Sequence, residues 1–183
     1  MQKQQEAFSF RNQLSRGQTG VMLAKMILRA RFPQIVDYDQ DMEMQKRGID
    51  LMVEGLGMVE VKTDYHTTPN FFIEVSVGPK PGTIDHSCAD IIAFIFPRLR
   101  EMFLIPRPHI VKWMRENWYW LRKKVKSIKS YQGKSRWTAE GVVVNRQELI
   151  DDVREMGGKV IIISWDESEE ILAQTTWEGG NGR

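Results

Sequence analysis

The chain has 183 residues, of which 42% are hydrophobic and 27% are charged, a balance that fits one folded domain and excludes a largely disordered chain. Its longest strongly apolar stretches, 91–96 and 160–163, are far shorter than the ~20 residues of a membrane-spanning helix. The first residues lack the apolar core of a secretory signal, and Cys88 is the single cysteine. We therefore expect an intracellular protein with no membrane contact and no disulfide within the chain.

The charges are distributed unevenly along the chain. Residues 98–136 contain twelve Lys and Arg and two acids, a local charge of +10, whereas the rest of the chain carries −8. The formal net charge of +2 therefore conceals a strongly basic segment. Such a segment is typical of a protein that binds a polyanion such as a nucleic acid.

Three helices are predicted from apolar residues at helical spacing. The first runs over 17–32 and ends before Pro33, and the second runs over 108–128 with a basic outer face. The third runs over 146–156 and is followed by Gly157, the residue type that most often ends a helix.

Short runs of β-branched, aromatic and alternating apolar residues predict the strands. Two of them, 49–54 and 58–64, flank the turn Gly55-Leu56-Gly57 and form a predicted hairpin. Further strands are expected at 35–44, 70–77, 90–96, 102–105 (at an edge), 141–144 and 160–164, and a basic loop at 131–137. Helices and strands mixed along one chain predict an α/β fold, with a central mixed β-sheet flanked by helices.

The predicted hairpin carries the most informative side chains. Glu60 and Lys62 share one face of their strand, and antiparallel pairing brings Asp50 near Glu60. Two carboxylates and the backbone carbonyl of Val61 suit Mg²⁺, with Mn²⁺ as a substitute, and such an ion activates water towards a phosphodiester. Lys62 would then orient or deprotonate that water, or offset charge on the phosphate. The alternative is an ordinary strand surface on which opposite charges pair.

These residues resemble the PD-(D/E)XK nuclease superfamily, with Ile49-Asp50 at the "PD" position and Glu60-Val61-Lys62 at the "(D/E)XK" position. The run EVKTD at 60–64 and the Asn-x-x-x-Glu pattern at 70–74 are similar to a subgroup from phage and bacterial genomes, with a looser match over 82–90. The resemblance covers about 17–96. It implies a restriction-endonuclease-like core and a Mg²⁺-dependent DNA endonuclease that works as a homodimer or higher homo-oligomer in a bacterial or phage-infected cytoplasm.

The chain departs from this family on its first helix. Relatives often carry a metal-binding glutamate where this sequence has Val21. Gln18 lies one turn earlier on the same face, and either reaches the metal site as a neutral catalytic residue or is a solvated residue at the helix start. Glu74 shares a strand face with Phe72, which makes it an accessory candidate, whereas Asp90 is expected to be structural.

The basic segment supplies the DNA-binding candidates. These are Arg122, Lys123, Lys124, Lys126, Lys129, Lys134 and Arg136. Basic side chains neutralise phosphates, and interleaved aromatic residues stack on unpaired bases. We expect most tryptophans, among them Trp113 and Trp120, to pack in the core with Leu121.

We expect a single domain over 1–183 with four parts. They are a nuclease core over 17–96, a basic helical DNA-binding segment over 98–137, a strand-helix-strand unit over 138–165 and an acidic, flexible tail over 166–183. The leading hypothesis is a DNA endonuclease, which leaves Holliday-junction resolvase, restriction-like and homing-type enzymes open. The alternatives are a non-catalytic DNA-binding module on a nuclease scaffold and an RNA-directed nuclease or RNA binder.

Overall fold

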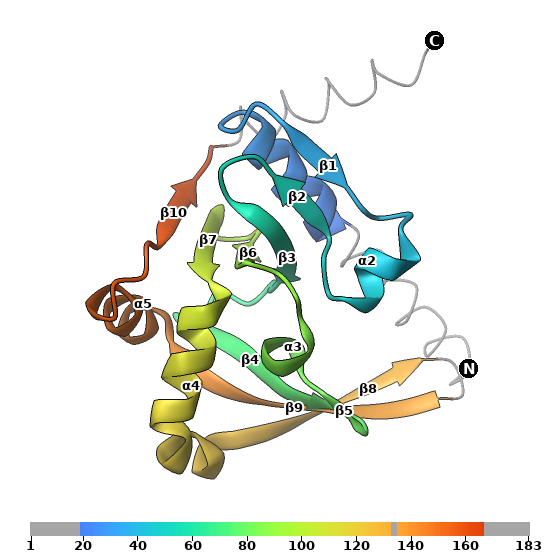
Figure 1. Cartoon of the computed structure of the whole chain (residues 1–183). Coiled ribbons are helices and arrows are strands. Elements are labelled where there is room, and N and C mark those ends of the chain that lie inside the picture. The colour runs from blue at the N-terminus through green and yellow to red at the C-terminus, as the bar shows by residue number, and fades with distance from the viewer. Residues whose placement is uncertain (1–18, 133–134, 167–183) are drawn as a thin grey trace.

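The computed structural model describes residues 19–132 and 135–166, and its strands form two sheets (Figure 1). The larger sheet contains, in spatial order, β1 (Ile35–Asp37), β2 (Leu51–Val53), β3 (Gly57–Thr63), β6 (Ile91–Phe96), β7 (Glu101–Pro106) and β10 (Ile161–Ser164). The smaller sheet contains β5 (Lys80–Pro81), β4 (Asn70–Val77), β9 (Ser135–Asn145) and β8 (Val125–Gln132). Only β3 and β6 pair in parallel among these strands, so the larger sheet is mixed, as predicted, and the smaller one is antiparallel.

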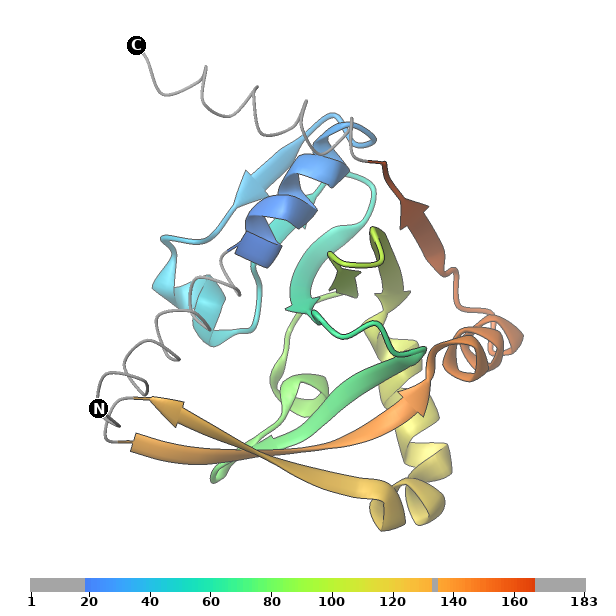
Figure 2. The ribbon, with the colours of Figure 1, turned by 180° about the vertical axis from the view of Figure 1, so that it is seen from behind.

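Helices flank the two sheets. They are a helix over 19–29, α2 (Met42–Lys46), α3 (Thr83–His86), α4 (Arg107–Leu121) with the 3₁₀ turn η1 (Arg122–Lys124), and α5 (Arg146–Glu155). Figure 2 shows the helix over 19–29 lying against the end of the larger sheet that contains β1 and β2. None of the helices in the described part of the chain has the length and hydropathy needed to cross a bilayer.

The larger sheet is buried on both faces, as its strand β6 shows. Phe94 and Phe96 point into a core between the two sheets, which α4 and α5 also cover; we call it the inter-sheet core. Ala93 and Ile95 point into a second core beneath the helix over 19–29, the helix-side core. This two-sided burial explains the continuous apolar run of β6.

The alternation of side chains along β3 also determines which face of the larger sheet carries the candidate site residues. Val59 and Val61 on β3 belong to the helix-side core. Because successive side chains of a strand point to opposite faces, Glu60 and Lys62 point to the other face, towards the smaller sheet.

Much of the predicted order of elements is confirmed. The hairpin of β2 and β3 turns at 54–56, and β4 has the predicted bounds of 70–77. The described part of the first helix and the C-terminal strand-helix-strand unit also lie where their patterns placed them. The tail lies outside the described residues, apart from Asp166.

The predicted helix over 108–128 is wrong in its second half. The helix ends at Leu121, and after η1 the chain forms β8, which pairs with β9 along its whole length. The predicted loop over 131–137 is also wrong, because its described residues belong to these two strands. The DNA-binding segment over 98–137 is therefore a helix followed by a hairpin rather than a helical unit. Three consecutive cations at the end of α4 suit the negative end of its helix dipole.

Two predicted strands differ from the structure. The strand over 35–44 is limited to β1, because Asp41 starts α2 by accepting hydrogen bonds from the backbone N–H groups of Glu43 and Met44. The strand over 102–105 is not at an edge. It is β7, which pairs with both β6 and β10.

Candidate functional site

The hairpin of β2 and β3 brings the two predicted carboxylates together. Leu51 pairs with Val59, and the same register places Asp50 opposite Glu60. Asp50 is held there by its side chain, because Oδ2 accepts a hydrogen bond of 2.7 Å from the backbone N–H of Val61. This confirms that the strand pairing predicted from the sequence juxtaposes Asp50 with the Glu60-Val61-Lys62 run.

Glu60 has one satisfied oxygen and one without a partner. Its side chain is buried, and Oε1 lies 2.9 Å from Nζ of Lys62. Oε2 is also buried, and it has no hydrogen-bond partner among the described residues. A buried carboxylate oxygen without a partner is strongly unfavourable, so this position calls for a cation or a bound water.

The two carboxylates also act on each other. Burial raises the pKa of Asp50 to about 6, and the negative charge of Glu60 acts in the same direction, against the hydrogen bond from Val61. At neutral pH Asp50 is therefore held as an anion in an environment that opposes its charge. A cation bound beside Asp50 would relieve this.

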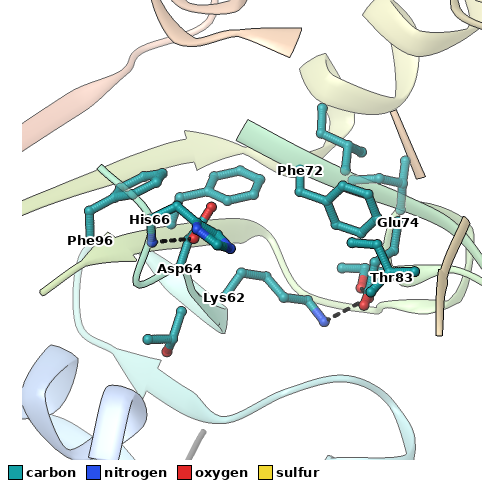
Figure 3. A pocket seen from close by; sticks show the side chains of 12 residues that line it. Lys62, Asp64, His66, Phe72, Glu74, Thr83 and Phe96 are labelled. Atoms are coloured by element: carbon teal, nitrogen blue, oxygen red, sulfur yellow. Dashed lines mark hydrogen bonds and ion pairs between the residues drawn. The ribbon is translucent and has the colours of Figure 1, made fainter. Parts of the chain in front are cut away.

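Lys62 bridges two acids from the two sheets. Its Nζ lies 2.9 Å from Oε1 of Glu60. It also lies 3.2 Å from Oε2 of Glu74 on β4 (Figure 3). Burial lowers the pKa of Lys62, but the charges of Glu60 and Glu74 more than offset this, so the pKa lies above its usual value. Lys62 is thus a cation at neutral pH. This state favours orienting water and offsetting phosphate charge over deprotonating water.

Glu74 is brought to the site as predicted for an accessory residue. Oε2 of Glu74 accepts a 2.6 Å hydrogen bond from the hydroxyl of Thr83, which begins α3. Burial raises the pKa of Glu74, but the charge of Lys62 and the hydrogen bond from Thr83 outweigh it, and the pKa lies below its usual range. Glu74 therefore stays ionised and fixes the ammonium group of Lys62.

A cavity of about 210 Å³ opens beside Lys62 between the two sheets (Figure 3). Its polar wall includes Asp64 and His66, and its apolar wall includes Phe72 and Phe96. No role for Thr83 or His66 is predicted from the sequence. Thr83 reaches Glu74 only through the fold of α3 against β4, and no local pattern signals that contact. His66 lies two residues after EVKTD and donates its backbone N–H to Oδ1 of Asp64 at 2.8 Å.

Asp50 and Glu60 suit a magnesium ion, which keeps several waters, better than a metal ion whose ligands all come from the protein. Within the described part of the chain, no group of three or more His, Cys, Asp and Glu is arranged to hold a metal ion. Mg²⁺, however, is commonly held by one or two carboxylates and keeps several waters. Asp50 and the free oxygen of Glu60 meet this need. Val61 lies between them, with its N–H bonded to Asp50 and its side chain in the helix-side core.

The first helix meets the site strand at close range. A side chain at Gly20 would overlap the hydroxyl of Thr63, the last residue of β3. Val21 packs against the helix-side core. Further along, Lys25 is buried and pairs with Asp37. Gln18 lies outside the described residues, so both interpretations of it stay open.

The expected structural role of Asp90 is confirmed. Its Oδ2 accepts a 2.8 Å hydrogen bond from the backbone N–H of Met58, and its own N–H bonds to the carbonyl of Met58. Gly57, at the start of β3, has a φ of +89° and lies so close that a side chain would overlap Asp90. Asp90 thus fixes the start of the strand that carries Glu60.

The described basic candidates are exposed. Arg122, Lys123 and Lys124 form η1, and Lys126 lies on β8. Lys126 shares a strand face with Ile128, which lines the cavity beside Lys62. Of the remaining candidates, Lys129 and Arg136 belong to β8 and β9, and Lys134 lies outside the described residues.

The expected burial of Trp120 is wrong. Trp113 and Leu121 are buried in the inter-sheet core, as predicted, but the side chain of Trp120 is 63% exposed and that of Trp118 is 41% exposed. The physical reason is the position of the apolar stripe on α4. The buried stripe is centred on Ile110, Met114 and Leu121, and Trp120 points about 100° away from its neighbour Leu121, at the margin of that stripe.

Comparison of the chain with models of protein families, with curated proteins and with solved structures gave no match.

Proposed function

We propose that the protein is a Mg²⁺-dependent DNA endonuclease that hydrolyses phosphodiester bonds, with Mn²⁺ as a substitute ion. The observation that carries the proposal is the partnerless buried oxygen of Glu60 beside Asp50, with the ammonium group of Lys62 on the same side. Two anions for a divalent ion and one cation for a phosphate are the groups that phosphodiester hydrolysis requires.

Each residue has a definite task in this proposal. Asp50 and Glu60 hold the ion, which supplies Lewis acidity towards water and phosphate. Lys62 is kept protonated by Glu60 and Glu74, and it stabilises negative charge that develops on the phosphate. Glu74 and Thr83 position Lys62.

The basic residues hold the DNA backbone in this proposal. Lys126 stands on the face of β8 that borders the site cavity through Ile128, so a strand held by Lys126 passes close to Lys62. Cutting both strands of a duplex takes two such sites, and we therefore expect a homodimer.

The first test uses plasmid, linear duplex and four-way junction DNA, each with Mg²⁺ and with EDTA. We expect cleavage only with the ion, and the preferred substrate separates a junction resolvase from a restriction-like or homing-type enzyme. Lys62→Ala should reduce the cleavage rate about 10²–10³-fold, because it removes a charge that acts on the transition state. Its DNA affinity should be retained.

The matched control is Lys46→Ala, which removes an exposed lysine from α2. This variant should cleave at the wild-type rate. Undiminished cleavage by Lys62→Ala would refute the assignment of the site.

The second candidate is a non-catalytic DNA-binding module. Val21 favours it, because this residue packs in the helix-side core where relatives present a metal-binding acid. Titration calorimetry of the wild type and Asp50→Asn with Mg²⁺ and Mn²⁺ separates the two candidates. Ion binding that depends on Asp50 supports the endonuclease, and DNA binding without any such ion binding supports the module.

A further inference from the structure

Three consecutive aromatic residues lie exposed at the end of α4. Trp118, Tyr119 and Trp120 are 41%, 58% and 63% exposed. Large aromatic side chains bury most of their surface when they serve the fold. The core contacts of α4 are made instead by Trp113 and Leu121. Packing among residues 19–132 and 135–166 therefore does not account for the three exposed rings.

Cations from η1 hold two of these rings. Nζ of Lys123 lies 4.5 Å from the ring centre of Tyr119 and 5.3 Å from that of Trp120. The guanidinium of Arg122 lies 5.1 Å from the ring centre of Tyr119. The two rings also meet edge to face, with their centres 5.5 Å apart. Tyr119, Trp120, Arg122 and Lys123 thus form one aromatic–basic cluster, in which the two rings are oriented by their neighbours. Trp118 adjoins this cluster through a cavity wall that it shares with Arg122.

Space for a ligand lies directly beside this cluster. A hollow of about 200 Å³ is bounded by Trp120, Lys124, Asn117 and Asn145. The indole of Trp120 offers an apolar wall, and Lys124 offers a positive charge on a wall that also carries Glu148. Asn117 donates its amide N–H to Trp113 and Asn145 accepts from the start of α5, which leaves the amide oxygen of Asn117 and the amide nitrogen of Asn145 for a ligand. This combination suits a planar heterocycle attached to a phosphate.

We propose that the aromatic–basic cluster binds unpaired bases of DNA. The rings stack on the bases, and Arg122, Lys123 and Lys124 contact the phosphates between them. A complete duplex hides the faces of its bases, so stacking selects DNA with unpaired nucleotides, such as flaps, bubbles and branch points. This inference deepens the proposed function and rests on it for the choice of nucleic acid as the ligand.

The fold connects the cluster with the candidate site. Trp118 and Arg122 line a cavity of about 590 Å³ between α3 and α4, and Ile84 of α3 lines both this cavity and the one beside Lys62. The residue before Ile84 is Thr83, which contacts Glu74. A DNA strand held at the cluster can therefore continue along α3 to the site.

The test measures binding in EDTA, where cleavage is excluded. Fluorescence anisotropy compares a labelled single-stranded oligonucleotide with a blunt duplex of the same length. Trp120→Ala should weaken binding to the single strand about tenfold, because one base loses its stacking partner, and should leave duplex affinity unchanged. Trp120→Phe, which keeps an aromatic ring, should restore most of the loss.

A matched control is Met42→Ala, which removes a 70% exposed apolar side chain from α2 and should change neither affinity. Equal losses on single strand and duplex, or no loss on either, would overturn the proposal. A third arm uses vesicles containing anionic lipid. Vesicle binding that depends on Trp120 while single-strand binding does not would assign the cluster to a membrane surface instead.

The outcome is separable from that of the proposed function. Should the wild type cleave no DNA, a selective loss of single-strand binding in Trp120→Ala would still establish the cluster. Should Trp120→Ala bind single strands as well as the wild type, cleavage that depends on Lys62 would still establish the endonuclease.

Discussion

Asp50 combines a position in the candidate site with an unfavourable charge. Because burial and Glu60 raise its pKa to about 6 from 3.8, the folded chain binds a proton there more tightly than the unfolded chain does. The stability that this proton confers is fully present below about pH 4 and is lost as the pH rises through about 6. The charge of Asp50 therefore lowers the free energy of unfolding of the metal-free protein at neutral pH.

We expect Asp50→Asn to raise the stability of the metal-free protein. Asparagine has the same shape, can accept the hydrogen bond from Val61 and carries no charge. The shift in pKa corresponds to about 3 kcal/mol at about pH 7.5, and the difference between the variant and the wild type should vanish near pH 4. Urea denaturation at both pH values measures this difference in the free energy of unfolding.

Magnesium supplies the control for this prediction. The ion should stabilise the wild type and leave Asp50→Asn unchanged, because an ion bound only to the folded state shifts the unfolding equilibrium. A variant less stable than the wild type at both pH values would show that Asp50 contributes to stability through contacts rather than opposing it through charge.

The residue scale also shows what a sequence can predict about a site. Asp50, Glu60 and Lys62 are brought together by one hairpin, and both hairpin turns and strand alternation are local patterns. Thr83 could not be predicted, because its bond to Glu74 depends on how α3 packs against β4. The raised pKa of Asp50 could not be predicted either, since burial is a property of the whole fold.

At the scale of elements, the contact between the first helix and β3 is unusually close. Gly20 faces Thr63, whose branched side chain at the end of a strand has little freedom to move aside. We expect Gly20→Ala to destabilise the protein by about 1–3 kcal/mol through overpacking. Helix propensity alone predicts the opposite sign, since alanine stabilises a helix relative to glycine by about 1 kcal/mol.

Urea denaturation distinguishes these two effects. Met22→Ala, a change at a partly exposed position of the same helix, is the matched control and should be nearly neutral. A Gly20→Ala variant more stable than the wild type would mean that the helix can shift away from β3.

The error at the end of α4 has a physical explanation on the same scale. Val125 and Ile128 lie three residues apart, which fits a helix, and the run VKSIKSYQ also fits a strand. The run becomes a strand because β9 provides a partner for it, and β9 is paired on its other side with β4. Pairing between distant segments thus overrides a local pattern.

At the scale of the whole molecule, the mixed sheet was predicted but the second sheet was not. β4 follows β3 directly in sequence, yet it pairs with β5 and β9, whereas β3 pairs with β2 and β6. The sequence of a single strand does not show to which sheet the strand belongs. The order of strands depends on contacts between distant segments, such as those that pack the two faces of β6 into the inter-sheet core and the helix-side core.

The uneven charge of the whole chain leads to a prediction about salt. If the basic segment holds DNA phosphates, Arg122→Ala, Lys123→Ala and Lys126→Ala should each reduce the slope of log affinity against log salt by about 0.9 on duplex DNA. The cause is that each lost contact releases one condensed counterion fewer. Duplex binding measured from low to moderate salt gives the slope.

Lys46→Ala, which removes an equally exposed cation from α2, should leave this slope unchanged. An unaltered slope in a variant that combines all three substitutions would place the DNA on another surface.

The position of β8 has a consequence for how copies of the molecule behave towards one another. β8 is the last strand of the smaller sheet, so among the described strands it has a neighbour on one side only. An open strand edge is a template for aggregation, and lysines along it disfavour pairing with a second chain. Lys126 is exposed on β8, and Lys129 belongs to the same strand. Lys126 therefore disfavours pairing of this edge with a second chain. If the proposed function is right, DNA bound at Lys126 would cover the same edge.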